Sequence, residues 1–288
     1  MRVVRAPGEL ERRDRAVAIG AFDGIHLGHR RVLEETLASG PAPTVITFDP
    51  HPRLVLGYDV ELLTSLERKL ELLGELGVEE TLVLEFTHEL QQEEPERFAE
   101  RVLETIGARV VVAGEDFRFG HRRRGNLELL RELGFDARAV PAVEGVSSTT
   151  IRALLHEGYV GRAAALLGRA AEVEGTVVTG DERGGTLGFP TANLAVPAHT
   201  LVPAYGIYAG FSRGCRAAVS IGLNPHYGGR ERRVEAFLLD FEGDLYGQRL
   251  VVELWERLRD EAVFESEEEL VTQIARDVEA TRRAERPI

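Results

Sequence analysis

The sequence predicts an α/β protein with two domains, a parallel-sheet domain followed by a small antiparallel β-barrel that carries a terminal helix. Its 288 residues match about two domains of roughly 150 residues each. Up to about residue 165, short apolar runs alternate with longer amphipathic segments, as in β/α units. From residue 173 onward, β-rich runs alternate with turns. The change near Gly168 places the domains at 1–167 and 168–288.

The first domain is expected to contain five strands and four helices in alternation. The strands are short runs rich in β-branched residues, at 17–22, 44–48, 81–86, 109–113 and 137–140. The helices are expected at 30–38, 65–76, 95–106 and 127–133. Ser65 can cap the second helix, because its hydroxyl can accept a hydrogen bond from a free backbone N–H. Strand-helix-strand repeats of this kind predict a parallel sheet.

The second domain is expected to consist of hairpin-connected strands at 173–178, 206–211, 216–222, 233–241 and 249–255. Turn-rich pieces at 212–214 and 242–244 separate them, which favours antiparallel pairing and a small barrel. After Glu265, apolar residues recur at helical spacing behind an acidic first turn, at Leu270, Ile274 and Val278. This spacing predicts a terminal helix packed on the barrel.

Composition excludes several classes of protein. With 48 acidic and 35 basic residues the formal charge is -13, which disfavours binding of nucleic acid through overall charge. The single cysteine, Cys215, can form neither an internal disulfide nor a cysteine-rich zinc site. No stretch of about 18 apolar residues occurs, and the first 15 residues lack a signal-peptide core. A cytoplasmic protein with no membrane partner is expected, and its oligomeric state is unknown.

The segment AIGAFDGIHLGH at 18–29 is the first candidate site, where a strand turns into a helix. Three glycines permit close backbone approach there: Gly20, Gly24 and Gly28. Free amides at a helix start favour phosphate, and His26 and His29 can stabilise charge during attack at an α-phosphorus. The alternatives are a tight turn with two surface histidines, or a metal pair for which Asp23 is the nearest extra carboxylate.

Two further segments carry polar side chains suited to phosphate. GEDFRFGHRRRGN at 114–126 follows a strand, so Asp116 lies where parallel sheets bind ligands, although the arginines at 122–124 also fit a solvated charge run. In VSSTTIRALL at 146–155, Ser147 or Ser148 can cap the helix that carries Arg152. Capping alone explains the serines, whereas an arginine in the first turn favours a phosphate.

In the barrel half, the glycine-rich segment 175–194 ends in Thr191 and Asn193, whose oxygens suit Mg²⁺. Gly188 and its neighbouring glycines can wrap a polyphosphate, but an ordinary turn between strands has the same pattern. Glu235 opens a strand and can accept a proton. Without further context, Glu235 is one of 48 acidic residues, and a surface strand position explains it better than a role as base.

Taken together, FDGIHLGH, TFDPHP, GEDFRFG and SSTTIR, in this order, resemble the N-terminal FMN adenylyltransferase module of bacterial bifunctional riboflavin kinase/FAD synthetases. LGFPTAN resembles the riboflavin kinase signature of their C-terminal module, so the resemblance covers nearly the whole chain. The HxGH pattern also occurs in class I aminoacyl-tRNA synthetases, which need a lysine-rich KMSKS loop. Lys69 is the single lysine here and is expected on a solvated helix face, which disfavours a synthetase.

The resemblance implies a Rossmann-like nucleotidylyltransferase domain that converts FMN and ATP to FAD and pyrophosphate, and a barrel that converts riboflavin and ATP to FMN and ADP. In the first domain it implies nucleotide contacts at Gly20, Phe22, Gly24, His26, His29, Ser148, Thr149 and Arg152. It places Asp116 near the nucleotide or the flavin. His26 and His29 would stabilise the reacting phosphates.

In the barrel, the resemblance implies that Thr191 and Asn193 hold MgATP beside Gly188, with Mg²⁺ as cofactor and ATP as co-substrate. It makes Glu235 the general base. ERLRDEAVFES fits the flavin-side loop of the kinase, where Arg259 and Glu261 would contact the flavin.

Some residues depart from the family pattern. NPTF is replaced by Asn224, Pro225, His226 and Tyr227, Phe237 stands where histidine is expected, and Gly185 stands where arginine is common. These changes bear on substrate affinity and loop geometry more than on chemistry. They leave two alternatives open, a monofunctional FMN adenylyltransferase with an impaired kinase barrel and a non-catalytic flavin- or nucleotide-binding regulator.

Overall fold

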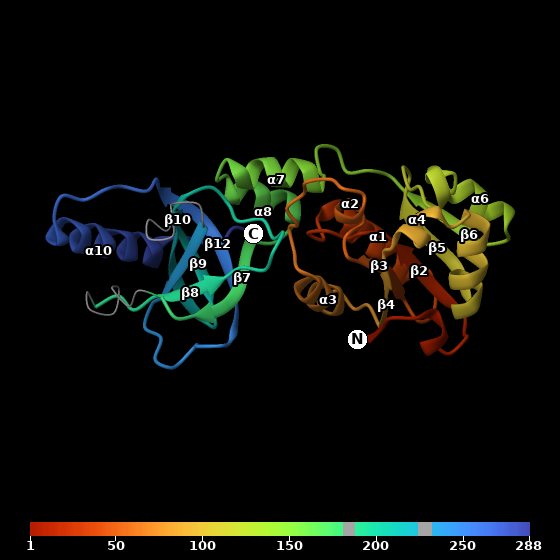
Figure 1. The fold of residues 1–288 in the computed structure, drawn as a ribbon, viewed down its shortest axis with the longest axis horizontal. Helices are drawn as coiled ribbons and strands as arrows, with labels where there is room; N and C mark the ends of the chain where they lie inside the picture. Colours follow the sequence, from red (N-terminus) through yellow and green to blue (C-terminus); the bar gives the residue numbers. More distant parts are fainter. Residues whose placement is uncertain (181–187, 224–231) are drawn as a thin grey trace. The chain divides into compact units, whose positions relative to one another are not determined.

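The computed structural model describes residues 1–180, 188–223 and 232–288, which form two compact units, Met1–Ser147 and Ser148–Ile288 (Figure 1). Helices α7 (Ser148–His156) and α8 (Val160–Leu167) belong to the second unit, where α8 packs on two barrel strands. The boundary at 167/168 remains a prediction for how the two activities divide along the chain.

The first unit is built on a six-stranded, wholly parallel sheet of order β1-β4-β3-β2-β5-β6, which confirms the predicted class. Its strands are β1 (Arg2–Val4), β2 (Arg15–Ile19), β3 (Thr44–Asp49), β4 (Glu80–Glu85), β5 (Ala108–Gly114) and β6 (Asp136–Val140). The edge strand β1 was not predicted, because three residues are too few to show a period.

The helices of this unit are α1 (Leu27–Ala38), α2 (Pro52–Val55), α3 (Leu66–Glu75), α4 (His88–Gln92), α5 (Pro95–Phe98) and α6 (Leu127–Glu132). A π-helical segment, Ala99–Glu104, continues α5, so the helix predicted at 95–106 is present with an irregular hydrogen-bond pattern. The short helices α2 and α4 were not predicted, because they are only one turn long.

Strand β2 lies at the centre of the sheet, between β3 and β5, and the strand order reverses there. Ligands of open parallel sheets bind at such a switch point, beyond the carboxyl ends of the strands. The strand predicted at 17–22 ends earlier, at Ile19, because Phe22, Gly24 and Ile25 adopt positive φ angles and turn the chain into α1. The histidine segment therefore begins at the switch point.

In the described part of the second unit, six antiparallel strands close into a barrel of order β10-β11-β8-β7-β12-β9. They are β7 (Ala171–Val178), β8 (Ala192–Ala195), β9 (Gly206–Ser212), β10 (Cys215–Leu223), β11 (Arg232–Leu238) and β12 (Arg249–Arg259). Of these, β8 was not predicted. The terminal helix is confirmed as α10 (Glu267–Arg283), which packs on β9 and β10 (Figure 1). None of the helices in the described ranges has the length and apolar character needed to cross a membrane.

Candidate active sites

The turn between β2 and α1 brings His26 and His29 together. His26 caps α1, with its Nδ1 accepting a hydrogen bond from the backbone N–H of His29 at 3.3 Å. The two imidazole rings stack with their centroids 3.7 Å apart and their planes 15° from parallel. His26 is buried and His29 is half-buried, which contradicts the alternative of two surface histidines.

Burial and nearby positive charges favour the neutral form of the His29 imidazole. Burial lowers the pKa of His29 well below its usual value, and the nearby positive charges of His26 and Lys69 lower it further. Phe22 is fully buried, with its ring edge-on to His29 at a centroid distance of 5.3 Å, so its side chain supports the imidazole from inside the fold. His29 Nδ1 is buried without a hydrogen-bond partner among the described residues. A neutral imidazole in this position suits protonation when an anion binds.

The turn is anchored to the segment that precedes α3. Asp23 Oδ1 accepts hydrogen bonds from the backbone N–H groups of Leu63 and Thr64, at 2.9 and 3.2 Å. In return, the Gly24 N–H donates to Thr64 Oγ1 at 3.2 Å. Asp23 therefore orders the turn, which weakens the alternative of a metal held by Asp23 and the two histidines. Over the residues that the structure describes, no cluster of three or more His, Cys, Asp or Glu side chains could hold a metal ion.

The expectation that Lys69 lies on a solvated helix face is wrong, since only 4% of its surface is exposed. Lys69 lies in α3, three and four residues before the buried Leu72 and Leu73, and therefore on the apolar side of the helix. Burial lowers the pKa of Lys69, while the carboxylates of Asp23 and Asp49 oppose the shift. Ser65 caps this helix as predicted, by accepting from the Arg68 N–H at 3.1 Å.

Beside the histidine turn lies an aromatic pocket of about 470 Å³ that the sequence analysis missed. Its phenylalanines lie near the end of β3, after the carboxyl ends of β4 and β5, or in α5: Phe48, Phe86, Phe98, Phe117 and Phe119. Gly20 belongs both to the pocket and to the histidine turn. Arg118, Arg122 and Arg123 line its rim, so two of the three arginines at 122–124 border a cavity. A planar, partly anionic ligand fits such a wall.

The remaining predicted residues of the adenylyltransferase motif lie in two places. Asp116 is exposed in the loop after β5, at the carboxyl edge of the sheet. Ser148 is the first residue of α7, followed by Thr149, and Arg152 lies in the next turn of that helix. Because α7 belongs to the second unit, the grouping of these three residues with the histidines remains a prediction.

In the barrel, strand register brings Asn193 and Glu235 face to face. Asn193 on β8 is directly opposite Glu235 on β11, and Ser220 on β10 lies on the other side of Glu235. Arg233, which the sequence analysis did not single out, bridges the first pair. Its Nε lies 2.9 Å from Asn193 Oδ1 and 2.8 Å from Glu235 Oε1. Directly opposed residues share one face of a sheet, so this row forms one polar surface.

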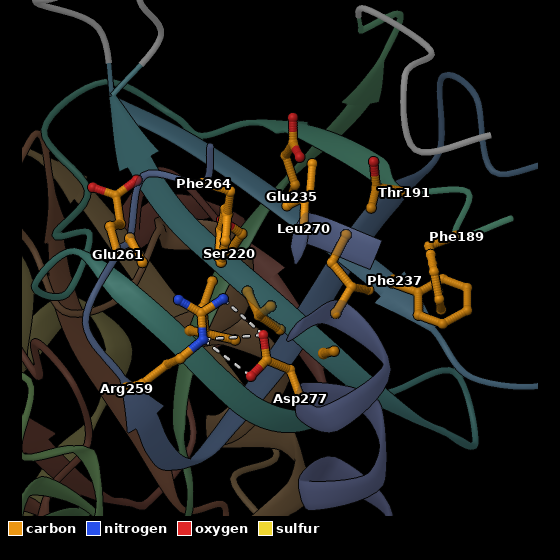
Figure 2. A pocket seen from close by; sticks show the side chains of 15 residues that line it. Phe189, Thr191, Ser220, Glu235, Phe237, Arg259, Glu261, Phe264, Leu270 and Asp277 are labelled. Carbon is orange, nitrogen blue, oxygen red and sulfur yellow. Dashed lines mark hydrogen bonds and ion pairs between the residues drawn. The ribbon is translucent and has the colours of Figure 1, made fainter. Parts of the chain in front are cut away.

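Two pockets meet at Thr191. The barrel pocket, a cavity of about 330 Å³, is lined by Thr191 and Glu235 together with Phe189, Phe237 and Arg259, among others. Figure 2 shows Glu235 and Thr191 toward one end of this pocket and Arg259 toward the other. A second cavity of about 180 Å³ also includes Thr191. Its other walls come from β7, β8, β11 and the segment 241–246: Val177, Ala192, Ala236, Leu238, Phe241 and Tyr246 among them.

Other predicted residues of the barrel border these pockets. Glu261 lines the barrel pocket, and desolvation raises its pKa against the opposing effect of Arg259. Phe237, one of the departures from the family pattern, packs edge-to-face on Phe189 with ring centroids 5.6 Å apart, so it completes an aromatic wall. Gly188 is exposed with a φ of 86°, beside the entry to β8. Gly185, His226 and Tyr227 lie outside the described residues.

The donor set in the barrel fits Mg²⁺. Thr191 and Asn193 offer hard, neutral oxygens, and Glu235 adds a carboxylate directly opposite Asn193. A Cβ on Gly180 would lie 2.1 Å from the Asn193 amide nitrogen, so the backbone closely encloses that side chain. Protein sites for Mg²⁺ combine few protein oxygens with substrate phosphates. In this structure Arg233 contacts both Asn193 Oδ1 and Glu235 Oε1, so the ion would have to replace the guanidinium at these oxygens.

Comparison with known proteins identifies two family modules in the chain. The family model for FAD synthetase matches residues 9–152, and the family model for riboflavin kinase matches residues 167–285. A bifunctional riboflavin kinase/FMN adenylyltransferase of Listeria monocytogenes is 34% identical, over 93% of this chain and 92% of its own. The bifunctional riboflavin kinase/FMN adenylyltransferase of Escherichia coli K12 is also 34% identical, over 91% of this chain and 90% of its own.

A solved structure shares the whole architecture. It is described as a macrolide-efflux protein from Streptococcus pneumoniae and superposes with a TM-score of 0.86 at 30% identity, covering 98% of this chain and 99% of its own. The likeness covers residues of both units.

Proposed function

Because the chain belongs to the family of bifunctional riboflavin kinase/FMN adenylyltransferases, we propose that each of its two units carries the catalytic groups of one reaction. The protein phosphorylates riboflavin with ATP to form FMN, and it transfers AMP from ATP to FMN to form FAD. What we propose is the role of individual residues in each of these two reactions.

In the adenylyl transfer, His26 and His29 bind the phosphates of ATP at the start of α1, where free amides also favour anions. A phosphate oxygen of FMN forms the new bond to the α-phosphorus of ATP, and the bond to the β-phosphate oxygen breaks to release pyrophosphate. The imidazoles donate hydrogen bonds to the charge that develops on the leaving group. The FMN phosphate is already an anion, so this step needs no general base.

The aromatic pocket beside that turn supports a place for the flavin ring of FMN. Phe48 and Phe86 form an edge-to-face pair with centroids 5.6 Å apart in its wall, and Gly20 connects the wall to the histidine turn. Asp116, at the same edge of the sheet, would lie near the nucleotide or the flavin. The resemblance also implies ATP contacts for Ser148, Thr149 and Arg152, which remain predictions.

In the kinase reaction, Glu235 accepts the proton of a ribityl hydroxyl as its oxygen attacks the γ-phosphorus of ATP, and ADP leaves. Thr191 and Asn193 would hold Mg²⁺, which supplies charge neutralisation for the phosphates when bound. Riboflavin would occupy the barrel pocket, with Arg259 and Glu261 as flavin contacts, and the adenosine of ATP would occupy the smaller pocket. Thr191 borders both cavities, which is where the two substrates must meet.

The observation that carries the kinase assignment is that Glu235 and Asn193 are directly opposed across β11 and β8. The test is chromatography of the products formed with ATP and Mg²⁺ from riboflavin and, in parallel, from FMN. FAD from both reactions supports two working sites. FAD from FMN alone would establish an impaired barrel, and no product from either would establish a binding protein without turnover.

We also propose a cytoplasmic location and no nucleic-acid partner, on the grounds of the net charge of -13 and the single cysteine. ATP, riboflavin, FMN and FAD are the small molecules that the two activities require.

A further inference from the structure

The ion pair between Arg259 and Asp277 joins the end of β12 to the middle of α10 inside the wall of the barrel pocket (Figure 2). Arg259 Nε donates to both carboxylate oxygens of Asp277, at 3.0 and 3.1 Å, and Nη2 donates to Oδ2 at 2.7 Å. Only 7% of the Asp277 surface is exposed. Such two-point pairing fixes the orientation of a guanidinium as well as its position.

Asp277 is itself held in place by its own helix. Gln273, one turn earlier on α10, donates from Nε2 to Asp277 Oδ1 at 2.9 Å. The carboxylate therefore receives hydrogen bonds from two side chains of the protein. Because little of its surface is exposed and its oxygens accept from Arg259 and Gln273, the main route by which Asp277 can act on a ligand is through Arg259.

Arg259, in contrast, has more N–H donors than its contacts with the protein use. A guanidinium has five N–H bonds. Nε and Nη2 serve Asp277, and Nη1 donates to the Asp260 carbonyl at 2.8 Å. Over the described ranges, one N–H on each Nη is left for a ligand. The ring of Phe264 lies 5.8 Å from the guanidinium carbon and restrains the plane from one face.

Helix α10 contributes more than this carboxylate to the pocket. Leu270 and Ile274 lie two turns and one turn before position 277, respectively, and line the same cavity. Three turns of one helix therefore contribute two apolar side chains and one buried carboxylate to the pocket. A helix whose only role was to cover the barrel would not need a carboxylate there.

We propose that Asp277 is a positioning residue of the riboflavin kinase site, which orients the guanidinium of Arg259 toward the flavin. The inference rests on the proposed contact between Arg259 and the flavin. It assigns a part of the substrate site to the C-terminal helix, and it predicts that loss of the carboxylate weakens riboflavin binding more than it slows phosphoryl transfer.

The test is a double-mutant cycle in the full-length protein, with Arg259→Ala, Asp277→Asn and the double variant. Riboflavin phosphorylation is measured as KM and kcat separately. Arg259→Ala is expected to raise KM for riboflavin on the order of tenfold, and Asp277→Asn somewhat less, with little change in kcat. The double variant should match Arg259→Ala alone, because Asp277 acts only through that arginine.

Two controls separate positioning from a general effect on the fold. Asp240→Asn removes an exposed bidentate pair that also anchors α10, with Arg282 at 2.7 and 2.9 Å, and should leave KM unchanged. FMN adenylylation by the same protein samples reports whether the first unit is intact. If Asp277→Asn does not fold, Gln273→Ala provides a milder test, with a KM rise of about two- to threefold expected from looser orientation of Asp277.

The outcomes distinguish the proposal from its premise. No change in KM for Arg259→Ala overturns the flavin contact, and the role of Asp277 falls with it. A raised KM for Arg259→Ala with a normal KM for both Asp277→Asn and Gln273→Ala overturns the positioning role alone. Additive effects in the double variant, or an equal effect of Asp240→Asn, would show that Asp277 acts on the helix as a whole and overturn the proposal.

Discussion

The two candidate sites bind the same co-substrate with different chemical groups. At the sheet edge, the proposed phosphate site consists of stacked imidazoles and a helix start, and the carboxylate of Asp23 accepts hydrogen bonds from backbone N–H groups. In the barrel, a carboxylate, Glu235, stands in a row of polar side chains with Arg233 beside it. The difference follows the nucleophile, since an FMN phosphate is already anionic whereas a ribityl hydroxyl must lose a proton.

Removing the carboxylate should therefore separate the two activities most strongly. Glu235→Gln keeps the size and the hydrogen-bonding capacity of the side chain but cannot take a proton, so riboflavin phosphorylation should fall by roughly 10²- to 10⁴-fold. FAD formation from FMN should persist. Initial rates from each starting flavin measure both effects.

The matched control is Glu256→Gln, because Glu256 is an exposed glutamate on another strand of the same barrel. Loss of both activities in a folded Glu235→Gln protein would contradict the division of one reaction to each unit.

His29→Ala is the reciprocal change. FAD formation should fall by roughly 10²- to 10³-fold, since a donor aimed at developing charge is removed, while FMN formation from riboflavin continues. His88→Ala, at an exposed histidine in the same unit, controls for the loss of an imidazole. A kinase rate that fell in parallel with FAD formation would refute the assignment.

The fold was predictable where local pattern determines structure, and the sites only in part. The strand, turn and helix around His26 and the strand that contains Glu235 could be recognised from their sequence motifs. The aromatic pocket was not, because its phenylalanines come from β3, α5 and the segments after β4 and β5 and meet only in the folded sheet. Arg233 and Asp277 were missed for the same reason, since their partners are 40 and 18 positions away.

Lys69 differs, because a signal for its burial was present in the sequence. The helical spacing to Leu72 and Leu73 places it on the apolar side of α3, and it is the single lysine among 35 lysine and arginine residues. In a chain that uses arginine at its other basic positions, the compact ammonium fits a buried position better than a guanidinium would. The position of Lys69 in the charged segment ERKLELL suggested a solvated face, and the spacing to the leucines was the better guide.

Burial of His29, with contributions from His26 and Lys69, gives the stability of the first unit a pH dependence. Because His29 is neutral in the fold and has an ordinary pKa of 6.5 when unfolded, the unfolded state binds more protons below that value. The free energy of unfolding of the first unit should thus fall as pH decreases through 6.5. Lys69→Met removes one of the charges that lower the pKa of His29, so that pKa should rise and the slope should flatten.

In Lys69→Met, titration of the His29 ring by NMR measures its pKa. Unfolding measured between about pH 5 and 8 gives the pH dependence of the free energy of unfolding. Lys69→Arg retains the positive charge and should keep the His29 pKa low even if the larger group lowers overall stability. An unchanged His29 titration in Lys69→Met would show that the two groups do not interact.

The smallest expected effect concerns the feature that the two sites share. Each proposed flavin pocket has an edge-to-face phenylalanine pair with centroids 5.6 Å apart, Phe48 with Phe86 at the sheet and Phe189 with Phe237 in the barrel. Loss of one aromatic partner costs about 1 kcal/mol, or roughly fivefold in affinity. Phe86→Leu should raise KM for FMN by that factor and leave KM for riboflavin unchanged, and Phe237→Leu should do the reverse. If Phe237→Leu left riboflavin binding unaffected, the aromatic pair would be packing alone, and the likeness between the two pockets would not extend to their ligands.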